Sequence, residues 1–423
     1  MRRAISRPLH SRLALVAIIP GVLLLLLTAC AGSTARATAT ATTTALACAI
    51  SIPISPPAVN GPGLQTTVAV PGHPFASVAS PSGLWIFVSL DGDQTGTGQL
   101  AVLQRTSTGG ARLAHLLALP DTPLGLALTR DGRLLIVADN SGVVVLDTAR
   151  AEAGAATAVL GSLATGPQAG TIEVAVSPDD HYVFATNEYS RESMVVIDLR
   201  AALSDGFVPA AQVGAVQLDY WPLGMAFSPD GRSLYVTSYA SQEAVSMYGR
   251  SALGVAAGTH AVGTLSVVDV ARAVQDPAHA VVGRAWAGCG PVRVALSASG
   301  DVAWVTAQVS NALLAFSTAK LLSDPQHALL ATVPVGPDPT GLVLVNGGTD
   351  VLVANSNRAT GGTAPETLSL VNTQRALAGQ SAVTGSIAVG MWPRELAADG
   401  QLAILTNFVS ETISLIDTTK LPS

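Results

Sequence analysis

Three charged residues occupy the same position in a phrase that recurs along this chain. When the copies are aligned on the proline that opens most of them, the residue two places further on is Glu173, Arg293 or Glu395 in three copies. Two carboxyl groups beside an arginine suit general acid–base chemistry with a stabilised oxyanion, as in the opening of a lactone ring. The alternative is a structural network in which Arg293 neutralises both carboxylates. The whole column reads Ala76, Gly125, Glu173, Gly224, Arg293, Gly341 and Glu395.

A second column lies immediately before the proline, and it holds residues that could contact a ligand. It reads His73, Thr122, Gly170, Trp221, Gly290, Asp338 and Trp392. Aromatic residues make up only 4% of the chain, so the two tryptophans stand out. They could stack on a ring-shaped ligand or simply cover the top of the core. His73 could act as an acid or base or be an ordinary surface residue. The candidate ligand-binding residues are His73, Tyr220, Trp221, Asp338, Trp392 and Arg394.

The repeated phrase predicts the fold that positions these side chains. It recurs at intervals of 48 to 52 residues, with one interval of 69. A period near 50 residues built from short strands and turns is typical of a β-propeller with one four-stranded blade per repeat. The turns lie at Ser80–Gly83, Thr129–Gly132, Ser177–Asp180, Ser228–Gly231, Ser297–Gly300, Asn346–Gly348 and Ala398–Gly400.

The two ends of the chain predict how the ring closes. Each repeat reads as four strands, A to D, with strand A innermost, but the last repeat stops after a third strand at Thr412–Asp417. Residues Leu64–Val70, before the first repeat, resemble the missing fourth strand. We therefore expect an all-β, seven-bladed propeller in which the N-terminal strand completes the last blade.

The first 63 residues predict export. Arginines precede an apolar stretch, Leu13–Leu27, which ends in Leu27-Thr28-Ala29-Cys30, the pattern of a secretory signal. The ending also resembles a bacterial lipobox, which implies lipidation of Cys30 and cleavage before it; the alternative is an ordinary signal peptide. We expect a lipoprotein signal peptide at 1–29, a flexible Ala/Thr/Pro-rich tether at 30–63 and the propeller at 64–423.

The remaining cysteines and the histidines indicate which disulfide and which metal sites the chain could form. In an oxidising compartment Cys48 and Cys289 could form a disulfide, or both could stay unpaired. The seven histidines show no zinc-like spacing, and no haem-attachment motif is present, so we expect no metal and no cofactor. The stretched interval places an insertion at 239–262, between two strands of the fourth blade, on the face that carries the candidate ligand residues.

Composition excludes one class of partner. The net charge is −6 and charged residues make up 12% of the chain, so the basic footprint of a nucleic-acid-binding protein is missing. Partners are expected to be a small molecule or an envelope protein, together with the membrane surface reached through lipid on Cys30. We expect a monomer.

Three segments carry a family resemblance. Leu134–Asn140, Tyr182–Asn187 and Val351–Asn355, each followed by a strand such as Val195–Asp198, look like the YVTN repeat. Over residues 64–420 the chain therefore resembles the YncE-like and lactonase-like seven-bladed propellers. The resemblance implies the fold, and its lactonase members imply a site of His, Glu and Arg in and around the channel.

Three functions follow as hypotheses. The first is a lipid-anchored extracytoplasmic binding module with its ligand or protein partner at the channel mouth. The second is a hydrolase that opens a sugar-acid lactone through Glu173, Glu395 and Arg293. The third is a purely structural cell-surface protein. An enzyme needs a carboxylate within reach of a substrate carbon, whereas a binding module tolerates a filled channel.

Overall fold

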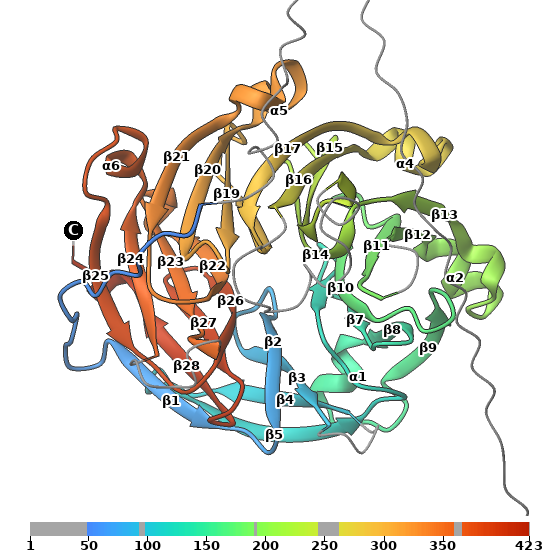
Figure 1. Ribbon diagram of the computed structural model, residues 1–423. Coiled ribbons are helices and arrows are strands. Elements are labelled where there is room, and N and C mark those ends of the chain that lie inside the picture. Colours follow the sequence, from blue (N-terminus) through green and yellow to red (C-terminus); the bar gives the residue numbers. More distant parts are fainter. Residues whose placement is uncertain (1–48, 93–97, 190–192, 244–261, 359–365, 423) are drawn as a thin grey trace, which may run out of the picture. The chain divides into compact units, whose positions relative to one another are not determined.

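The strands form a ring of antiparallel sheets, as the repeat predicts. The computed structural model describes residues 49–92, 98–189, 193–243, 262–358 and 366–422. Within these residues the strands make seven four-stranded antiparallel sheets, and the fold is a seven-bladed β-propeller. Figure 1 shows the blades arranged around a central axis, along which inward-facing side chains meet in what we call the channel, with β2, β10, β14, β22 and β26 nearest the axis.

Each blade uses four consecutive strands, from the innermost to the outermost. Blades one to three comprise β2 (His73–Ala79), β3 (Trp85–Asp91), β4 (Gln99–Arg105) and β5 (Ala111–Ala118); β6 (Leu126–Leu128), β7 (Leu134–Ala138), β8 (Gly142–Asp147) and β9 (Val159–Ala164); and β10 (Thr171–Val176), β11 (Tyr182–Asn187), β12 (Ser193–Asp198) and β13 (Gln212–Gln217). Blades four to six comprise β14 (Tyr220–Phe227), β15 (Ser233–Ala240), β16 (Val262–Asp269) and β17 (Val281–Cys289); β18 (Pro291–Leu296), β19 (Val302–Ala307), β20 (Ala312–Ser317) and β21 (Leu329–Pro334); and β22 (Pro339–Val345), β23 (Asp350–Asn355), β24 (Thr367–Asn372) and β25 (Val383–Ala388).

The seventh blade closes the ring as predicted. It contains β26 (Pro393–Asp399), β27 (Leu402–Asn407) and β28 (Thr412–Asp417), and its outer strand is β1 (Gln65–Ala69). Strand β1 pairs with β28 in antiparallel register, with Gln65 opposite Ile416. The prediction that the N-terminal strand completes the last blade is confirmed. Because the first and last parts of the chain share one sheet, unfolding at the seam must break a complete ladder.

Hydrogen bonds between neighbouring blades run round the whole ring, and their hydroxyl donors lie on second strands except for Thr340 of β22. A Thr or Ser hydroxyl donates to the backbone carbonyl of the next blade at six of the seven junctions, as with Thr406 to Phe75 across the seam (2.9 Å). At the junction of blades two and three the Gly125 amide donates to the Ile172 carbonyl instead. These bonds fix the spacing of the inner strands, and with it the distances between side chains that face the channel.

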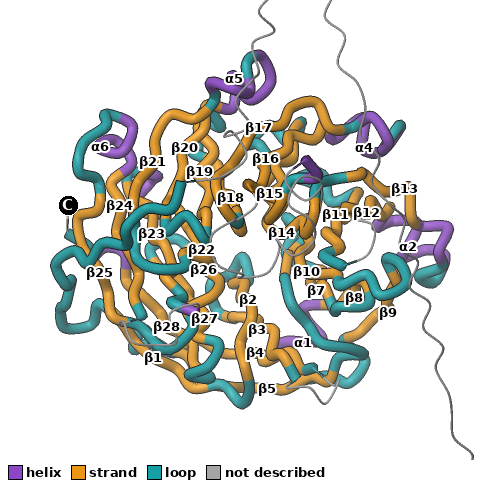
Figure 2. The backbone as a smooth tube through the Cα atoms, in the orientation of Figure 1, coloured by secondary structure: helices purple, strands orange, loops and turns teal. Residues whose placement is uncertain are grey.

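The polar residue that ends five of the third strands, an aspartate in blades two, three and four, has a structural role. Within the described residues five short helices follow third strands, namely α1 (Thr148–Glu152), α2 (Leu199–Asp205), α4 (Val270–Gln275), α5 (Thr318–Ser323) and α6 (Thr373–Leu377). In each case the last strand residue is the N-cap, and its side chain accepts a hydrogen bond from a backbone amide of the first turn. Figure 2 shows α2, α4, α5 and α6 at the rim of the ring. Single turns of 3₁₀ helix are η1 (Pro209–Ala211), η3 (Pro277–His279), η4 (Pro325–His327), η5 (Asn346–Gly348) and η7 (Thr418–Lys420).

The turn signal between the first two strands also has a physical cause. The Ser228 hydroxyl donates to Asp230 and accepts from the Ser233 amide, which pins the hairpin. Gly231 has φ of +70°, and a side chain there would run into Pro178 of the preceding blade. The Ser-Pro-Asp-Gly phrase therefore forms the hairpin of its own blade and packs that hairpin against the one of the preceding blade.

The chain before β1 lies against the outside of blades five and six. The Ser51 amide donates to the Ser310 carbonyl, Ile54 donates to Val335, and Val59 donates to Ser386 in a short parallel bridge. Composition predicts a flexible tether over 30–63, but the described part from 51 to 59 is held by these bonds. Proline-rich chain is already extended, so it can lie along an outer strand at little further cost in entropy.

Candidate functional site

The residues that open the inner strands adopt an unusual backbone conformation. The position before the proline has positive φ in five blades, at Gly170, Trp221, Gly290, Asp338 and Trp392. Glycine tolerates this conformation, whereas other residues pay about 1–2 kcal/mol for it. Two blades therefore have glycine at this position, where the backbone is unstrained. The other three have a tryptophan or an aspartate, whose backbone is strained. Strain of this kind is concentrated at functional sites.

The charged column forms an ion-pair triad in the channel. The Arg293 Nε lies 2.7 Å from Glu395 Oε2, and its Nη2 lies 3.2 Å from Glu173 Oε2. The third guanidinium nitrogen, Nη1, lies 3.4 Å from the Val292 carbonyl. These three residues, which we call the channel triad, come from β10, β18 and β26 in blades three, five and seven. The structure thus brings together the side chains that the column groups.

Glycine elsewhere in that column makes room for the triad. A side chain at Gly125 would overlap the Glu173 carboxyl, and one at Gly224 would come within 2.8 Å of the Arg293 Cα. Small residues in the intervening blades therefore let the strands approach closely enough for one arginine to reach both carboxylates.

The channel triad holds its charges in poorly hydrated surroundings. Burial raises the pKa of Glu173 to about 7, against the opposing attraction of Arg293, and the Glu395 carboxylate raises it further. The two carboxylates in turn raise the pKa of Arg293, although burial acts against them as the largest influence. Burial therefore favours the protonated form of Glu173 within the channel triad.

An apolar cluster lies next to the triad and explains its poor hydration. Phe75, Ile172 and Leu223 are buried and pack together with Ala76, and Val292 and Phe408 are half-buried against them. These side chains come from five different blades, so they meet across the channel.

At the mouth of the channel Arg394 has no ionic partner among the described residues. Its guanidinium carbon lies 3.8 Å from the centre of the Phe75 ring and 5.4 Å from that of Phe408. The Arg394 Nε is buried without a hydrogen-bond partner in the part of the chain that the structure describes. Burial, together with Arg358 and Arg293, lowers the pKa of Arg394, because these effects outweigh the attraction of the nearby acids.

A second arginine lies beside the first. The guanidinium carbon of Arg358, at the end of blade six's second strand, is 5.1 Å from the centre of the Trp392 ring. Trp392 is in turn stacked near Phe408, with ring centres 6.2 Å apart and planes 20° from parallel. We call Glu188, Trp221, Tyr239, Arg358, Trp392 and Arg394 the mouth cluster.

The acids and the tyrosine near the mouth are also perturbed. Burial raises the pKa of Glu188, against the attraction of Arg394, Arg293 and Arg358. Burial likewise raises the pKa of Glu366 to about 7, and it also raises the pKa of Tyr239. The Asp338 carboxylate contributes to both shifts. Several titratable groups with shifted pKa values at one place mark a candidate functional site.

The other residues predicted to bind a ligand lie at this end of the propeller. His73 is stacked on Phe408, with ring centres 4.9 Å apart, and its Nδ1 lies 3.0 Å from the Phe408 carbonyl. Tyr220 opens β14 opposite Ala240. Trp221 contacts Tyr239, with ring centres 5.7 Å apart. The buried Asp338 receives a hydrogen bond on its carbonyl from the Ser356 hydroxyl.

The inner-strand columns contain only half of the mouth cluster. They lack Glu188, Tyr239 and Arg358, and they also lack the neighbouring Phe408; all four residues follow the second strand of a blade or lie near its end. A further column taken at the end of the second strands reads Asp91, Asn140, Glu188, Tyr239, Gln308, Ser356 and Phe408, and it would have found three of the four. Both columns belong to the same end of the channel because the strands are antiparallel.

Some sequence predictions fall partly or wholly outside the described residues. Cys30 and Cys48 lie there, and so does most of the insertion at 239–262. Cys289 is buried and disulfide-bonded, and its backbone contacts Ser310, the residue that binds Ser51. The pairing with Cys48 stays a prediction. In the described part of the chain no helix is long and apolar enough to cross a membrane, and no His, Cys, Asp and Glu side chains group as metal ligands.

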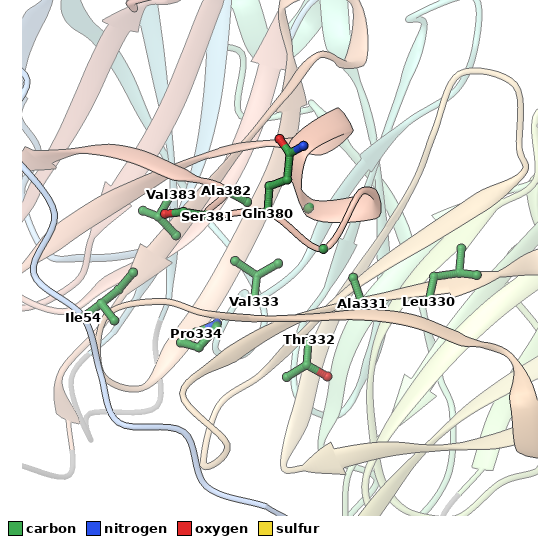
Figure 3. Close-up of a pocket in the computed structure, with 12 residues that line it drawn as sticks. Ile54, Leu330, Ala331, Thr332, Val333, Pro334, Gln380, Ser381, Ala382 and Val383 are labelled. Atoms are coloured by element: carbon green, nitrogen blue, oxygen red, sulfur yellow. The ribbon is translucent and has the colours of Figure 1, made fainter.

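A separate groove lies on the outer side of blades five and six. It has a volume of about 470 Å³, and Figure 3 shows Ile54 at one end, β21 along one wall and residues 380–383 along the other. No ionisable side chain lines it. Its lining mixes apolar side chains with Thr332, Gln380 and Ser381 and offers no acid–base chemistry, so the channel mouth is the candidate functional site.

Comparison with solved structures identifies the fold and nothing finer. Hydrazine synthase of Kuenenia stuttgartiensis is similar with a TM-score of 0.62 and 15% identity, over 86% of this chain and 99% of that one. The Cps50 (Swd1) β-propeller domain of Myceliophteria thermophila is similar with a TM-score of 0.58 and 13% identity, over 84% and 99%. The fold is shared. No protein-family model and no curated protein matches the chain.

Proposed function

We propose that this protein is an extracytoplasmic, lipid-anchored binding module that holds a small ligand at the channel mouth. One observation carries the proposal: Trp221, Asp338 and Trp392 keep left-handed backbone where Gly170 and Gly290 occupy the equivalent positions. A retained strain of about 1 kcal/mol or more at each position needs a compensating use for the side chain.

The surroundings of these residues suit a ligand. Aromatic rings lie next to an arginine without an ionic partner among the described residues, and acids with raised pKa values lie close by. Aromatic faces bind the apolar side of a small molecule, and a few charged groups orient it. The predicted export signal and predicted lipidation of Cys30 support an extracytoplasmic surface, in line with the resemblance to YncE-like proteins.

The rival function is a lactone hydrolase, and one observation favours it. Glu173 has a pKa of about 7, which suits a general acid or base at neutral pH. Against it, all three guanidinium nitrogens of Arg293 already face a carboxylate or carbonyl oxygen, so the arginine is engaged in the channel triad rather than directed at a developing oxyanion. The balance favours a structural channel triad beneath a binding surface.

One screen separates these functions. The full-length protein is tested by thermal shift and by turnover against lactones, sugar acids, neutral sugars and aromatic acids, with Trp221→Gly and Glu173→Gln in parallel. We expect at least one compound to stabilise the wild type, with the shift lost in Trp221→Gly and no turnover. Turnover lost in Glu173→Gln would establish the hydrolase. If no compound stabilises the protein and none is turned over, the structural role is the remaining function.

A further inference from the structure

The mouth cluster contains a positive charge that the described protein does not neutralise. Arg394 makes no ion pair with a described residue. Arg293, which lies one position further along the inner strand of its own blade, pairs with two carboxylates. The Arg394 Nε is buried without a hydrogen-bond partner among the described residues. Leaving a guanidinium donor unused in poorly hydrated surroundings is unfavourable.

A second cation makes this place more attractive to an anion. Arg358 is exposed and has no ion pair among the described residues, and its guanidinium lies over Trp392, the residue two places before Arg394. The two arginines repel each other, which is one reason for the lowered pKa of Arg394. An anionic group placed between them would relieve the repulsion and accept hydrogen bonds from both.

The nearest acids do not fill this role. Glu395 is committed to Arg293 at 2.7 Å, and Glu188 has a raised pKa because of burial. Burial disfavours the charged form of Glu188, so this carboxyl compensates a neighbouring cation only in part.

Three aromatic rings at the mouth are stacked on one another. His73, Phe408 and Trp392 follow one another with interplanar angles of 17° and 20°. Flat groups prefer offset stacking on such surfaces, so the geometry favours a flat ligand over a puckered one.

We infer that the ligand is a carboxylate carried on a flat ring, with the carboxylate held by Arg394 and Arg358 and the ring against Trp392 and Phe408. This inference rests on the proposed function, and it names the chemistry that the channel mouth recognises. The two arginines supply the bidentate donors that match a carboxylate, and the stacked rings supply the flat wall.

Three small probes separate charge from flatness. Benzoate is flat and anionic, benzamide is flat and neutral, and cyclohexanecarboxylate is anionic and puckered. Each is titrated into the full-length protein up to 20 mM, with binding followed by calorimetry and by the fluorescence of the tryptophans. We expect benzoate to bind at least about tenfold more tightly than benzamide, because a hydrogen bond to a charged group contributes about 1.5–3 kcal/mol. It should also bind more tightly than cyclohexanecarboxylate, because only a flat ring stacks on the aromatic side chains.

Variants assign the effect to the arginines. Arg394→Met should weaken benzoate about 10- to 100-fold and leave benzamide unchanged, and Arg394→Lys should recover part of the loss. Arg272→Met, which removes an exposed charge on α4 at the other end of the propeller, is the matched control and should bind benzoate as the wild type does. Circular dichroism of each variant checks that it is folded.

The outcomes distinguish this inference from the proposed function. Equal binding of benzoate and benzamide, or full binding of benzoate by folded Arg394→Met, would overturn the carboxylate inference while a binding site at the mouth remained. Failure of benzoate to bind at 20 mM would also overturn it. The proposed function itself fails only if the broader screen, which includes neutral compounds, finds no ligand that depends on Trp221.

Discussion

Glu173 makes the stability of the propeller depend on pH. The Glu173 side chain is only 14% exposed, and burial raises its pKa from 4.5 to about 7 in the folded protein. The folded state therefore binds a proton more readily than the unfolded chain between these values. A group of this kind stabilises the fold fully below its unfolded pKa, and the contribution is lost as the pH rises through the folded pKa. Stability should fall from pH 5 to pH 8.

The size of the effect follows from the shift. One pKa unit corresponds to about 1.4 kcal/mol, so the whole shift is worth about 3 kcal/mol, of which about 2.5 kcal/mol is lost between pH 5 and pH 8. Glu173→Gln keeps the shape of the side chain and removes the titration. Between pH 5 and pH 8 the wild type should therefore lose about 2.5 kcal/mol more unfolding free energy than Glu173→Gln does.

Chemical denaturation at pH 5 and pH 8 measures this difference. Asp205→Asn, at an exposed position in α2, is the matched control for loss of one carboxyl group and should keep the pH dependence of the wild type. If Glu173→Gln shows the same loss of stability as the wild type, Glu173 is not held in poorly hydrated surroundings, and the account of the channel triad is wrong.

Two further predictions concern the channel triad and the N-terminal segment. Arg293→Met leaves Glu173 and Glu395 without a counter-ion and should cost about 3–5 kcal/mol of unfolding free energy, more at pH 8 than at pH 5, by chemical denaturation; an equal cost at both pH values would contradict the pairing. Peptide mapping should find Cys48 linked to Cys289, and reduction should lower the unfolding free energy by about 2–5 kcal/mol; a different partner for Cys289 would refute this prediction.

The fold was predictable because its determinants are local and repeated. The turn phrase around Ser228 and the capping aspartates such as Asp198 recur in register with the strands, so period and punctuation together define the blades. Closure through β1 was predictable because the last repeat lacks one strand. The packing of residues 51–59 was not, because a proline-rich stretch has the same composition whether it is free or lies against a surface.

The site was only half predictable, for a geometric reason. Glu173, Arg293 and Glu395 share one column, so their proximity follows from ring symmetry. Arg358 lies beyond the end of a second strand, where loop lengths differ between blades and the columns lose register. The left-handed backbone at the mouth was also hidden, because a tryptophan gives no sign of positive φ.

The central claim is that Trp392 is retained for binding rather than for stability. Trp392→Gly removes one strained position and a half-exposed ring, and Gly170 and Gly290 show that the backbone accepts glycine at this place. Relief of strain and loss of packing should nearly cancel, so the unfolding free energy of Trp392→Gly should lie within about 1 kcal/mol of the wild type. A loss of 3 kcal/mol or more, the range found when a core aromatic is truncated, would show that Trp392 covers the core and would contradict the claim.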